Sequence, residues 1–83
     1  METVTYTPKA VKALKRMPRD QAELVRSKVR QYADDPASLA NNVTELKGRA
    51  GFRLRVGNWR VIMDEDDTVV DVLDVGPRGN IYG

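Results

Sequence analysis

The stretch 46–63 carries five cationic side chains and no acidic one. Two alternating runs within it, FRLRV and WRVIM, flank the dipeptide Gly57-Asn58, a pattern typical of a tight β-hairpin. In the first run Arg53 and Arg55 share one face of the strand, and the apolar side chains share the other. Arginine presents a planar fork of donors that fits two phosphate oxygens at once. The stretch therefore predicts a nucleic-acid site, formed by Lys47, Arg49, Arg53, Arg55 and Arg60.

The charge distribution around this stretch is one-sided. The following residues, 64–74, contain six acidic side chains and no cation. A surface adapted only for solubility mixes the two signs, whereas segregated charge produces a directional field. Arginines on the open face of an antiparallel sheet can also be an ordinary solvated surface, and this alternative stays open on composition alone.

Few standard catalytic mechanisms suit the chain, because it has no histidine and no cysteine. RNA cleavage is one that does, since the neighbouring 2′-hydroxyl of the substrate is the nucleophile. The protein must hold the phosphate in line and neutralise the charge of the transition state, which arginines can do. A tyrosine can act on the hydroxyl if nearby cations lower its pKa from about 10. Arg78 and Tyr82 follow the last predicted strand, although spacing alone favours an ordinary aromatic residue at position 82.

Length and composition indicate a single domain over residues 1–83. The net charge is +2 and the pI is about 9.2. Without cysteine there is no disulfide or thiolate zinc site, and the acidic run 64–67 lacks the spacing of a calcium loop. We therefore expect no metal and no small-molecule cofactor. No apolar run has the length of a membrane span or a signal peptide, so we expect a cytoplasmic protein that does not interact with membranes.

The elements that must position these residues follow from periodicity and turn signals. We expect a strand over 2–7, a helix from Pro8 to about Met17 capped by Thr7, and a second helix over 19–34 ended by Asp35-Pro36. After a polar loop, 36–42, come strands over 43–47, 52–56 and 59–63, a turn over 64–67 and an interior strand over 68–75. Gly76 and Pro77 are expected to break that strand. The fold class is therefore α+β, with a helical hairpin on one face of a small antiparallel sheet in the order β-α-α-β-β-β-β.

Apolar spacing also predicts which side chains are buried. The first helix is expected to bury Val11, Leu14 and Met17. The second is expected to bury Ala22, Val25, Val29 and Tyr32. Phe52 and Trp59 can stack on unpaired bases, but their faces favour the core.

Several segments together resemble one family. They are a TPKA helix start, an LKG turn, the strands FRLRV and GNWRVI, an acidic turn, the strand VDVLDVG and a final RGNIY. Through these segments the chain resembles the RelE/ParE superfamily of bacterial toxin–antitoxin toxins, and within it the RelE-like branch. The resemblance covers most of the chain. It implies a RelE-like fold.

The resemblance also implies a function. Toxins of the RelE branch are ribosome-dependent endoribonucleases that cut mRNA, and an antitoxin that wraps the toxin inhibits them. By position, Arg53 and Arg55 are implied to grip RNA and Arg60 to contact the scissile phosphate. Arg78 is implied to stabilise the transition state or leaving group, and Tyr82 to act on the 2′-hydroxyl. The implied partners are a cognate antitoxin, the ribosome and mRNA.

The chain departs from the family pattern at two places. Pro77 stands where many relatives have histidine, and arginines stand at positions 53 and 55 where some have lysine. Arginine keeps its proton near neutral pH, so it cannot be a general acid. Two alternatives remain: a ParE-like toxin that inhibits DNA gyrase without nuclease activity, and an inactive binding module on the same fold.

Overall fold

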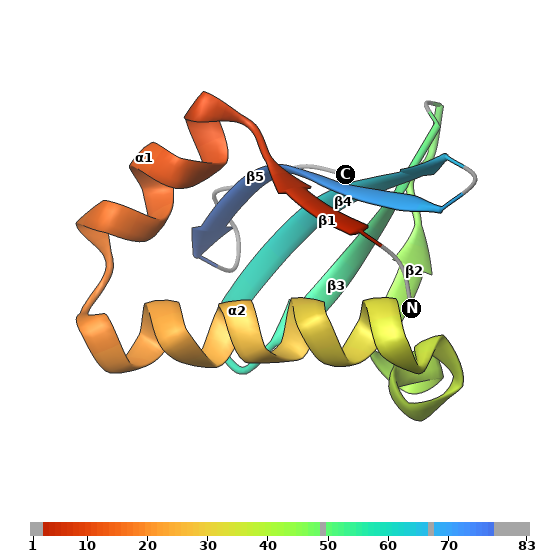
Figure 1. The fold of residues 1–83 in the computed structure, drawn as a ribbon, viewed down its shortest axis with the longest axis horizontal. Helices are drawn as coiled ribbons and strands as arrows, with labels where there is room; N and C mark the ends of the chain where they lie inside the picture. Colours follow the sequence, from red (N-terminus) through yellow and green to blue (C-terminus); the bar gives the residue numbers. More distant parts are fainter. Residues whose placement is uncertain (1–2, 49, 67, 78–83) are drawn as a thin grey trace.

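The computed structural model describes residues 3–48, 50–66 and 68–77. The predicted α+β class and element order are confirmed, with one short helix added. The elements are β1 (Thr3–Tyr6), α1 (Pro8–Arg16), α2 (Arg19–Asp34), the 3₁₀ helix η1 (Pro36–Asn42), β2 (Val43–Glu45), β3 (Phe52–Val56), β4 (Trp59–Asp66) and β5 (Val69–Pro77) (Figure 1).

The sheet has the strand order β1-β5-β4-β3-β2. All neighbouring pairs are antiparallel except β1 and β5, which are parallel, so the sheet is mixed rather than purely antiparallel. A tight hairpin would force an antiparallel pair, but β1 is followed by two helices and meets β5 from the far end of the chain. The strand predicted to be interior, β5, does lie inside the sheet, and β4 is central.

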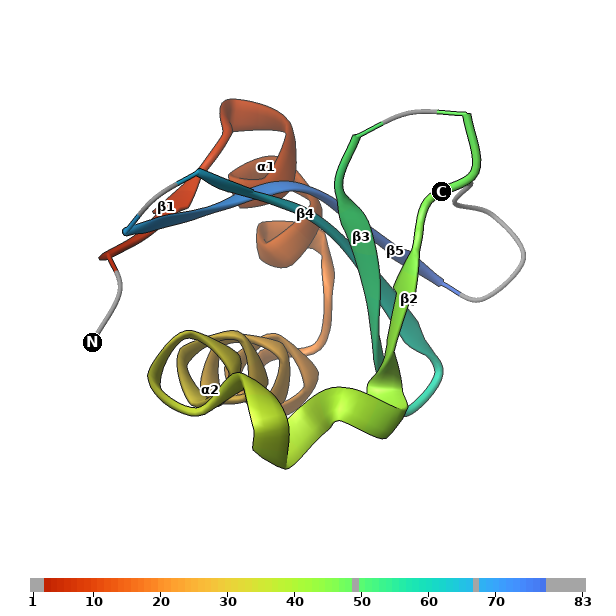
Figure 2. The same ribbon diagram turned by 90° about the vertical axis from the view of Figure 1, so that its right-hand side faces the viewer.

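One face of the sheet packs on α2, which is seen nearly end-on beneath it in Figure 2. The predicted stripe on α2 is confirmed, since Ala22, Val25, Val29 and Tyr32 are all buried. They join the side chains of β3, β4 and β5 in one core cluster. The α1 stripe differs from the prediction. Its buried residues, Ala10 and Leu14, are four positions apart, and Val11 and Met17 lie half-buried beside that line.

Thr7 connects α1 to the sheet. Its hydroxyl oxygen accepts a hydrogen bond from the backbone N–H of Ala10 at 3.2 Å, which is the predicted N-cap. The same hydroxyl donates to the carbonyl of Leu73 at 2.7 Å. Leu73 lies in a β-bulge, because Ile62 pairs with Asp74 while Met63 pairs with Val72. The cap residue therefore also satisfies a carbonyl at the irregular point of β5.

Several boundaries differ from the sequence prediction. The predicted loop 36–42 is a 3₁₀ helix whose Leu39 is buried, and the strand predicted over 43–47, β2, stops at Glu45. The acidic residues 64–66 continue β4, because Asp66 still pairs with Val69. Gly76 and Pro77 do not break β5. Pro77 is its last residue, where a missing N–H disturbs little of the ladder.

No helix in the described ranges combines the length and the apolar composition needed to cross a membrane.

Candidate nucleic-acid interface

Three arginines gather on the face of the sheet turned away from α2. Arg55 on β3 and Arg60 on β4 are direct cross-strand partners. Arg53 lies two residues earlier on β3, where it is opposite Thr44 of β2 and Ile62 of β4. Like charges directly opposite one another in a sheet are destabilising. The fold therefore holds cations together at some cost, which an anion bound between them would offset.

The arginines share a pocket of about 130 Å³ with neutral polar side chains. The 3₁₀ helix η1 ends just before β2, which brings Asn41 and Asn42 beside β3. The side-chain amide of Asn42 donates to the backbone carbonyl of Arg55 at 3.3 Å. The complete lining is Asn41, Asn42, Thr44, Arg53, Arg55 and Arg60.

The acids on this face do not neutralise Arg53 or Arg55. Within the described residues, neither of these arginines forms an ion pair or a side-chain hydrogen bond. Asp74 is on the same face of the sheet, but its carboxylate pairs with Lys9 at 3.2 Å. Arg60 is half-buried, and its guanidinium donates to the carbonyl of Trp59 at 3.4 Å. The pocket therefore keeps a positive charge that is available to a ligand.

Phe52 and Trp59 belong to the core side of the same strands, as the sequence favoured. The ring of Phe52 packs on Tyr32 with centroids 5.1 Å apart. The indole N–H of Trp59 donates to the side-chain carbonyl of Gln21 at 3.0 Å. Both aromatic residues hold the hairpin against α2, which fixes the strands that carry the arginines.

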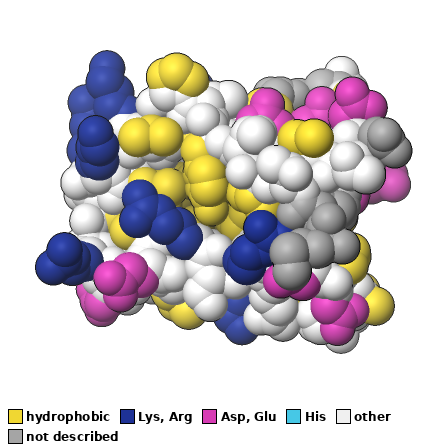
Figure 3. Space-filling view, in the orientation of Figure 1, with side chains coloured by type: hydrophobic (Ala, Val, Ile, Leu, Met, Phe, Trp, Pro, Cys, Tyr) yellow, Lys and Arg dark blue, Asp and Glu magenta, His cyan; other side chains and the backbone are white. Residues whose placement is uncertain are grey.

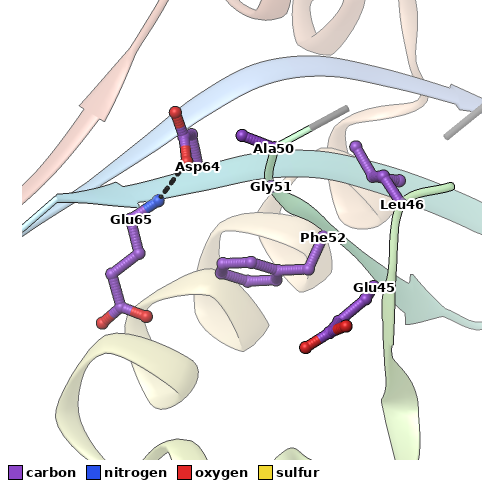
Figure 4. A pocket seen from close by; sticks show the side chains of 7 residues that line it. All are labelled: Glu45, Leu46, Ala50, Gly51, Phe52, Asp64 and Glu65. Atoms are coloured by element: carbon purple, nitrogen blue, oxygen red, sulfur yellow. Dashed lines mark hydrogen bonds between the residues drawn. The ribbon is translucent and has the colours of Figure 1, made fainter. Parts of the chain in front are cut away.

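Acidic side chains gather at the other end of β4. They line a larger pocket, of about 400 Å³, together with Phe52; its acidic residues are Glu45, Asp64 and Glu65, and the carboxylates of Asp64 and Glu65 point away from the ring of Phe52 (Figure 4). Asp64 accepts from the backbone N–H of Glu65 at 2.9 Å, and Glu65 accepts from the hydroxyl of Tyr32 at 3.2 Å. Phosphate would be repelled here, so the smaller arginine pocket is the better candidate for RNA.

A second group of cations lies away from the arginine pocket. Lys and Arg side chains gather over α1, and Asp and Glu side chains gather near the turn between β4 and β5 (Figure 3).

Tyr6 is not an activated phenol. Burial raises its pKa above the usual 10.0, although Arg26 and Arg30 act in the opposite direction. It lies on β1, and two strands separate β1 from β3. Within the described residues it therefore offers no general base to the arginine pocket.

Comparison with known proteins gives a consistent assignment. A model of the ParE toxin of type II toxin–antitoxin systems, parDE, matches residues 4–82. The chain belongs to this toxin family. No curated protein matches the sequence.

The toxin is also similar to solved structures. A chain of the archaeal RelE–RelB complex from Pyrococcus horikoshii OT3 is 26% identical, with 96% of this chain and 98% of that chain covered and a TM-score of 0.78. A chain of the E. coli RelBE toxin–antitoxin complex is 20% identical, with coverages of 96% and 100% and a TM-score of 0.75. YafQ from E. coli strain BL21(DE3) is 12% identical over 100% of both chains, with a TM-score of 0.80. The resemblance to RelE-like toxins and the predicted RelE-like fold are confirmed.

The structure brings four of the predicted site residues of the toxin together. Arg53, Arg55 and Arg60 share one pocket, and exposed Lys47 lines an adjoining one with Arg53. The other three predicted residues, Arg49, Arg78 and Tyr82, lie outside the described residues. Asn41 and Thr44 were missed as site residues. Asn41 precedes the strand that pairs with β3, and Thr44 lies within it. The sequence indicated only a turn and a short strand there, not the pairing with β3.

Proposed function

We propose that the toxin is an endoribonuclease that cleaves mRNA on the ribosome and thereby inhibits translation. The observation that carries this proposal is the cross-strand pair Arg55–Arg60 with Arg53 beside it, in a pocket where Arg53 and Arg55 have no acidic partner among the described residues. Members of the RelE branch, which the chain resembles, act in this way. The pocket supports the proposal because it offers permanent cations to a phosphate.

The proposed reaction is attack of the 2′-hydroxyl oxygen on the adjacent phosphorus, which breaks the bond from phosphorus to the 5′-oxygen of the next nucleotide. The 2′-hydroxyl gives up its proton, and the departing 5′-oxygen takes one up. Charge on the non-bridging oxygens grows as the phosphorane-like transition state forms. Arg60 and Arg55 stabilise that charge, and the partial burial of Arg60 strengthens its effect by lowering the local dielectric. The sheet fixes the backbone positions from which the two guanidinium groups reach the phosphate.

Tyr82 and Arg78 complete the proposed site through the family resemblance. Tyr82 is assigned to the 2′-hydroxyl and Arg78 to the transition state or leaving group. Arg49 and Lys47 are assigned to the RNA backbone. With Pro77 in place of a histidine, and with arginines that retain their protons, Tyr82 is the residue that can transfer a proton among those assigned to the reacting groups, Arg55, Arg60, Arg78 and Tyr82.

We also propose an antitoxin as the partner that regulates the toxin. Similar solved structures include RelE–RelB and RelBE toxin–antitoxin complexes. The segregated charge of the toxin favours an acidic antitoxin segment that competes for Arg53 and Arg55. The complex of toxin and antitoxin should then weaken as the salt concentration rises, and equal affinity at low and high salt would contradict this electrostatic account.

Gyrase inhibition without nuclease activity is the second candidate function. The observation that favours it is the match of nearly the whole chain, 4–82, to the ParE toxin model. The two functions predict different targets, since a gyrase inhibitor arrests growth while mRNA stays intact.

Mapping the 5′ ends of a translated mRNA in cells induced to express the toxin separates these candidates. The nuclease proposal expects cuts at fixed positions within codons that disappear when the start codon is removed. Growth arrest with intact mRNA points to gyrase or another protein target. Arg60→Ala and Tyr82→Phe should each relieve growth arrest without loss of folding, and full toxicity of a well-expressed double mutant would rule the site out.

A further inference from the structure

The arginine pocket has a neutral wall that phosphate binding does not require. Asn41, Asn42 and Thr44 form this wall. Asn42 has a structural role, because its amide donates to the carbonyl of Arg55 and joins η1 to β3. The side chains of Asn41 and Thr44 are exposed and, within the described residues, make no hydrogen bond. They are polar residues in the lining of the pocket whose side chains have no hydrogen-bond partner among the described residues.

The neutral wall and the arginines form different kinds of hydrogen bond. Arginine side chains are donors only, so they bind any phosphate regardless of the base attached to it. The side-chain amide of Asn41 has two N–H donors and a carbonyl acceptor, and the hydroxyl of Thr44 can donate or accept a hydrogen bond. A donor and an acceptor side by side can match the edge of a base, and Asn pairs in this way with N6 and N7 of adenine. The neutral wall is therefore suited to discrimination between bases.

The volume of the pocket limits how a nucleotide can lie in it. At about 130 Å³ it is well below the roughly 300–1,000 Å³ of pockets that enclose a whole drug-sized ligand. It has room for a phosphate group among the arginines while the base stays at the rim. Asn41 lines the pocket and is exposed, so an unstacked base of single-stranded RNA can present its edge to it.

We propose that Asn41 reads the base of the nucleotide whose phosphate Arg53 and Arg55 hold, with adenine preferred, and that Thr44 supports this contact. This inference rests on the proposed RNA-binding function. It assigns base preference to the end of η1 and affinity to the arginines of β3.

Binding of short RNAs to the free toxin tests the division. Four fluorescein-labelled uridine pentanucleotides, with A, C, G or U at the centre, are titrated at low salt and followed by fluorescence anisotropy. Arg55→Ala should weaken binding of all four by a similar factor. Asn41→Ala should weaken the adenine oligonucleotide by about fivefold or more, the lower end of a bidentate contact, and remove its advantage over the others. Ser27→Ala, an exposed hydroxyl on α2, is the matched control and should change nothing.

The outcomes distinguish this inference from the nuclease proposal. If Asn41→Ala leaves the ratios among the four affinities unchanged, Asn41 does not read the base, whether or not the toxin cleaves mRNA. A preference for another base that Asn41→Ala abolishes would keep base reading and overturn the adenine assignment. If the wild-type toxin binds none of the oligonucleotides, the inference fails. Loss of discrimination in Asn41→Ala, with no mRNA cleavage in cells, would retain the inference and refute the nuclease.

Discussion

Replacing Arg55 should make the toxin more stable while weakening its hold on RNA. Arg55 lies directly opposite Arg60 and has no ion-pair partner among the described residues. Opposed like charges in a sheet cost about 0.2–1 kcal/mol, and because Arg55 is exposed we take a middle value of about 0.5 kcal/mol. In a domain of this size, about 1 kcal/mol shifts Tm by roughly 4–8 °C. Arg55→Thr, which keeps a good strand former, should therefore raise Tm by about 2–4 °C at low salt.

Two further substitutions at position 55 separate charge from shape. Arg55→Lys keeps the cation and should leave Tm close to that of the wild type. Arg55→Glu replaces the repulsion with a cross-strand attraction and should raise Tm more than Arg55→Thr does. Thermal unfolding in low and in high salt checks the cause, since screening should shrink the differences within the series.

RNA affinity should move in the opposite direction. A phosphate contact to single-stranded RNA contributes about −0.7 to the slope of log K against log salt. Arg55→Thr should reduce the size of that slope by about this amount, and Arg55→Glu should abolish measurable binding. A toxin that is destabilised by Arg55→Thr at low salt, or that keeps its full salt slope, would refute the view that the Arg55–Arg60 pair is held together for an anion.

Three other predictions concern the framework of the site. Gly51→Ala should destabilise the toxin by more than about 1 kcal/mol in a denaturant titration, because Gly51 has φ +106° and a Cβ would lie 2.7 Å from a carbonyl oxygen of β4. Gly48 is the control: it has φ +75° but open space around it, so Gly48→Ala should destabilise the toxin less. Gln21→Ala removes the hydrogen-bond acceptor of the Trp59 indole and should lower the free energy of unfolding by about 1 kcal/mol. The Trp59 ring should also become more exposed to solvent, which tryptophan fluorescence can measure. Tyr6 has a raised pKa in the folded state, so its contribution to stability is complete below its unfolded pKa and declines as pH rises through 10 and above. Tyr6→Phe should flatten the loss of Tm in that alkaline range.

The sequence predicted the elements well because their signals are local. Thr7-Pro8 predicted the helix start, and the Gly57-Asn58 step predicted the hairpin that pairs Arg55 with Arg60. The parallel pairing of β1 with β5 was missed, since nothing within either strand encodes which distant strand it meets. The continuation of β4 into residues 64–66 was also missed. Acidic side chains favour turns, but here the partner strand supplies the ladder that keeps them extended.

The site was predicted only in part for the same reason. Alternation placed Arg53 and Arg55 on one face, and hairpin geometry added Arg60. Asn41 and Thr44 join them through the pairing of β2 with β3, a contact that depends on how η1 turns the chain. An amide residue at the end of a short helix carries no sequence signal beyond turn chemistry, so the place of Asn41 in the pocket follows only from the tertiary arrangement.

The acidic end of the sheet does not neutralise the arginine pocket. Arg60 and Asp64 are both in β4, four residues apart, which corresponds to about 14 Å at about 3.4 Å per residue. This separation exceeds the Debye length of about 8 Å at physiological ionic strength, so the interaction of Arg60 with Asp64 through the solvent is weak. The net charge of +2 therefore understates the local field that an RNA phosphate meets at Arg53 and Arg55. Under the proposed RNA-binding function, the acids would repel a strand held at the arginines from the far end of β4, and the strand would then continue over the η1 side.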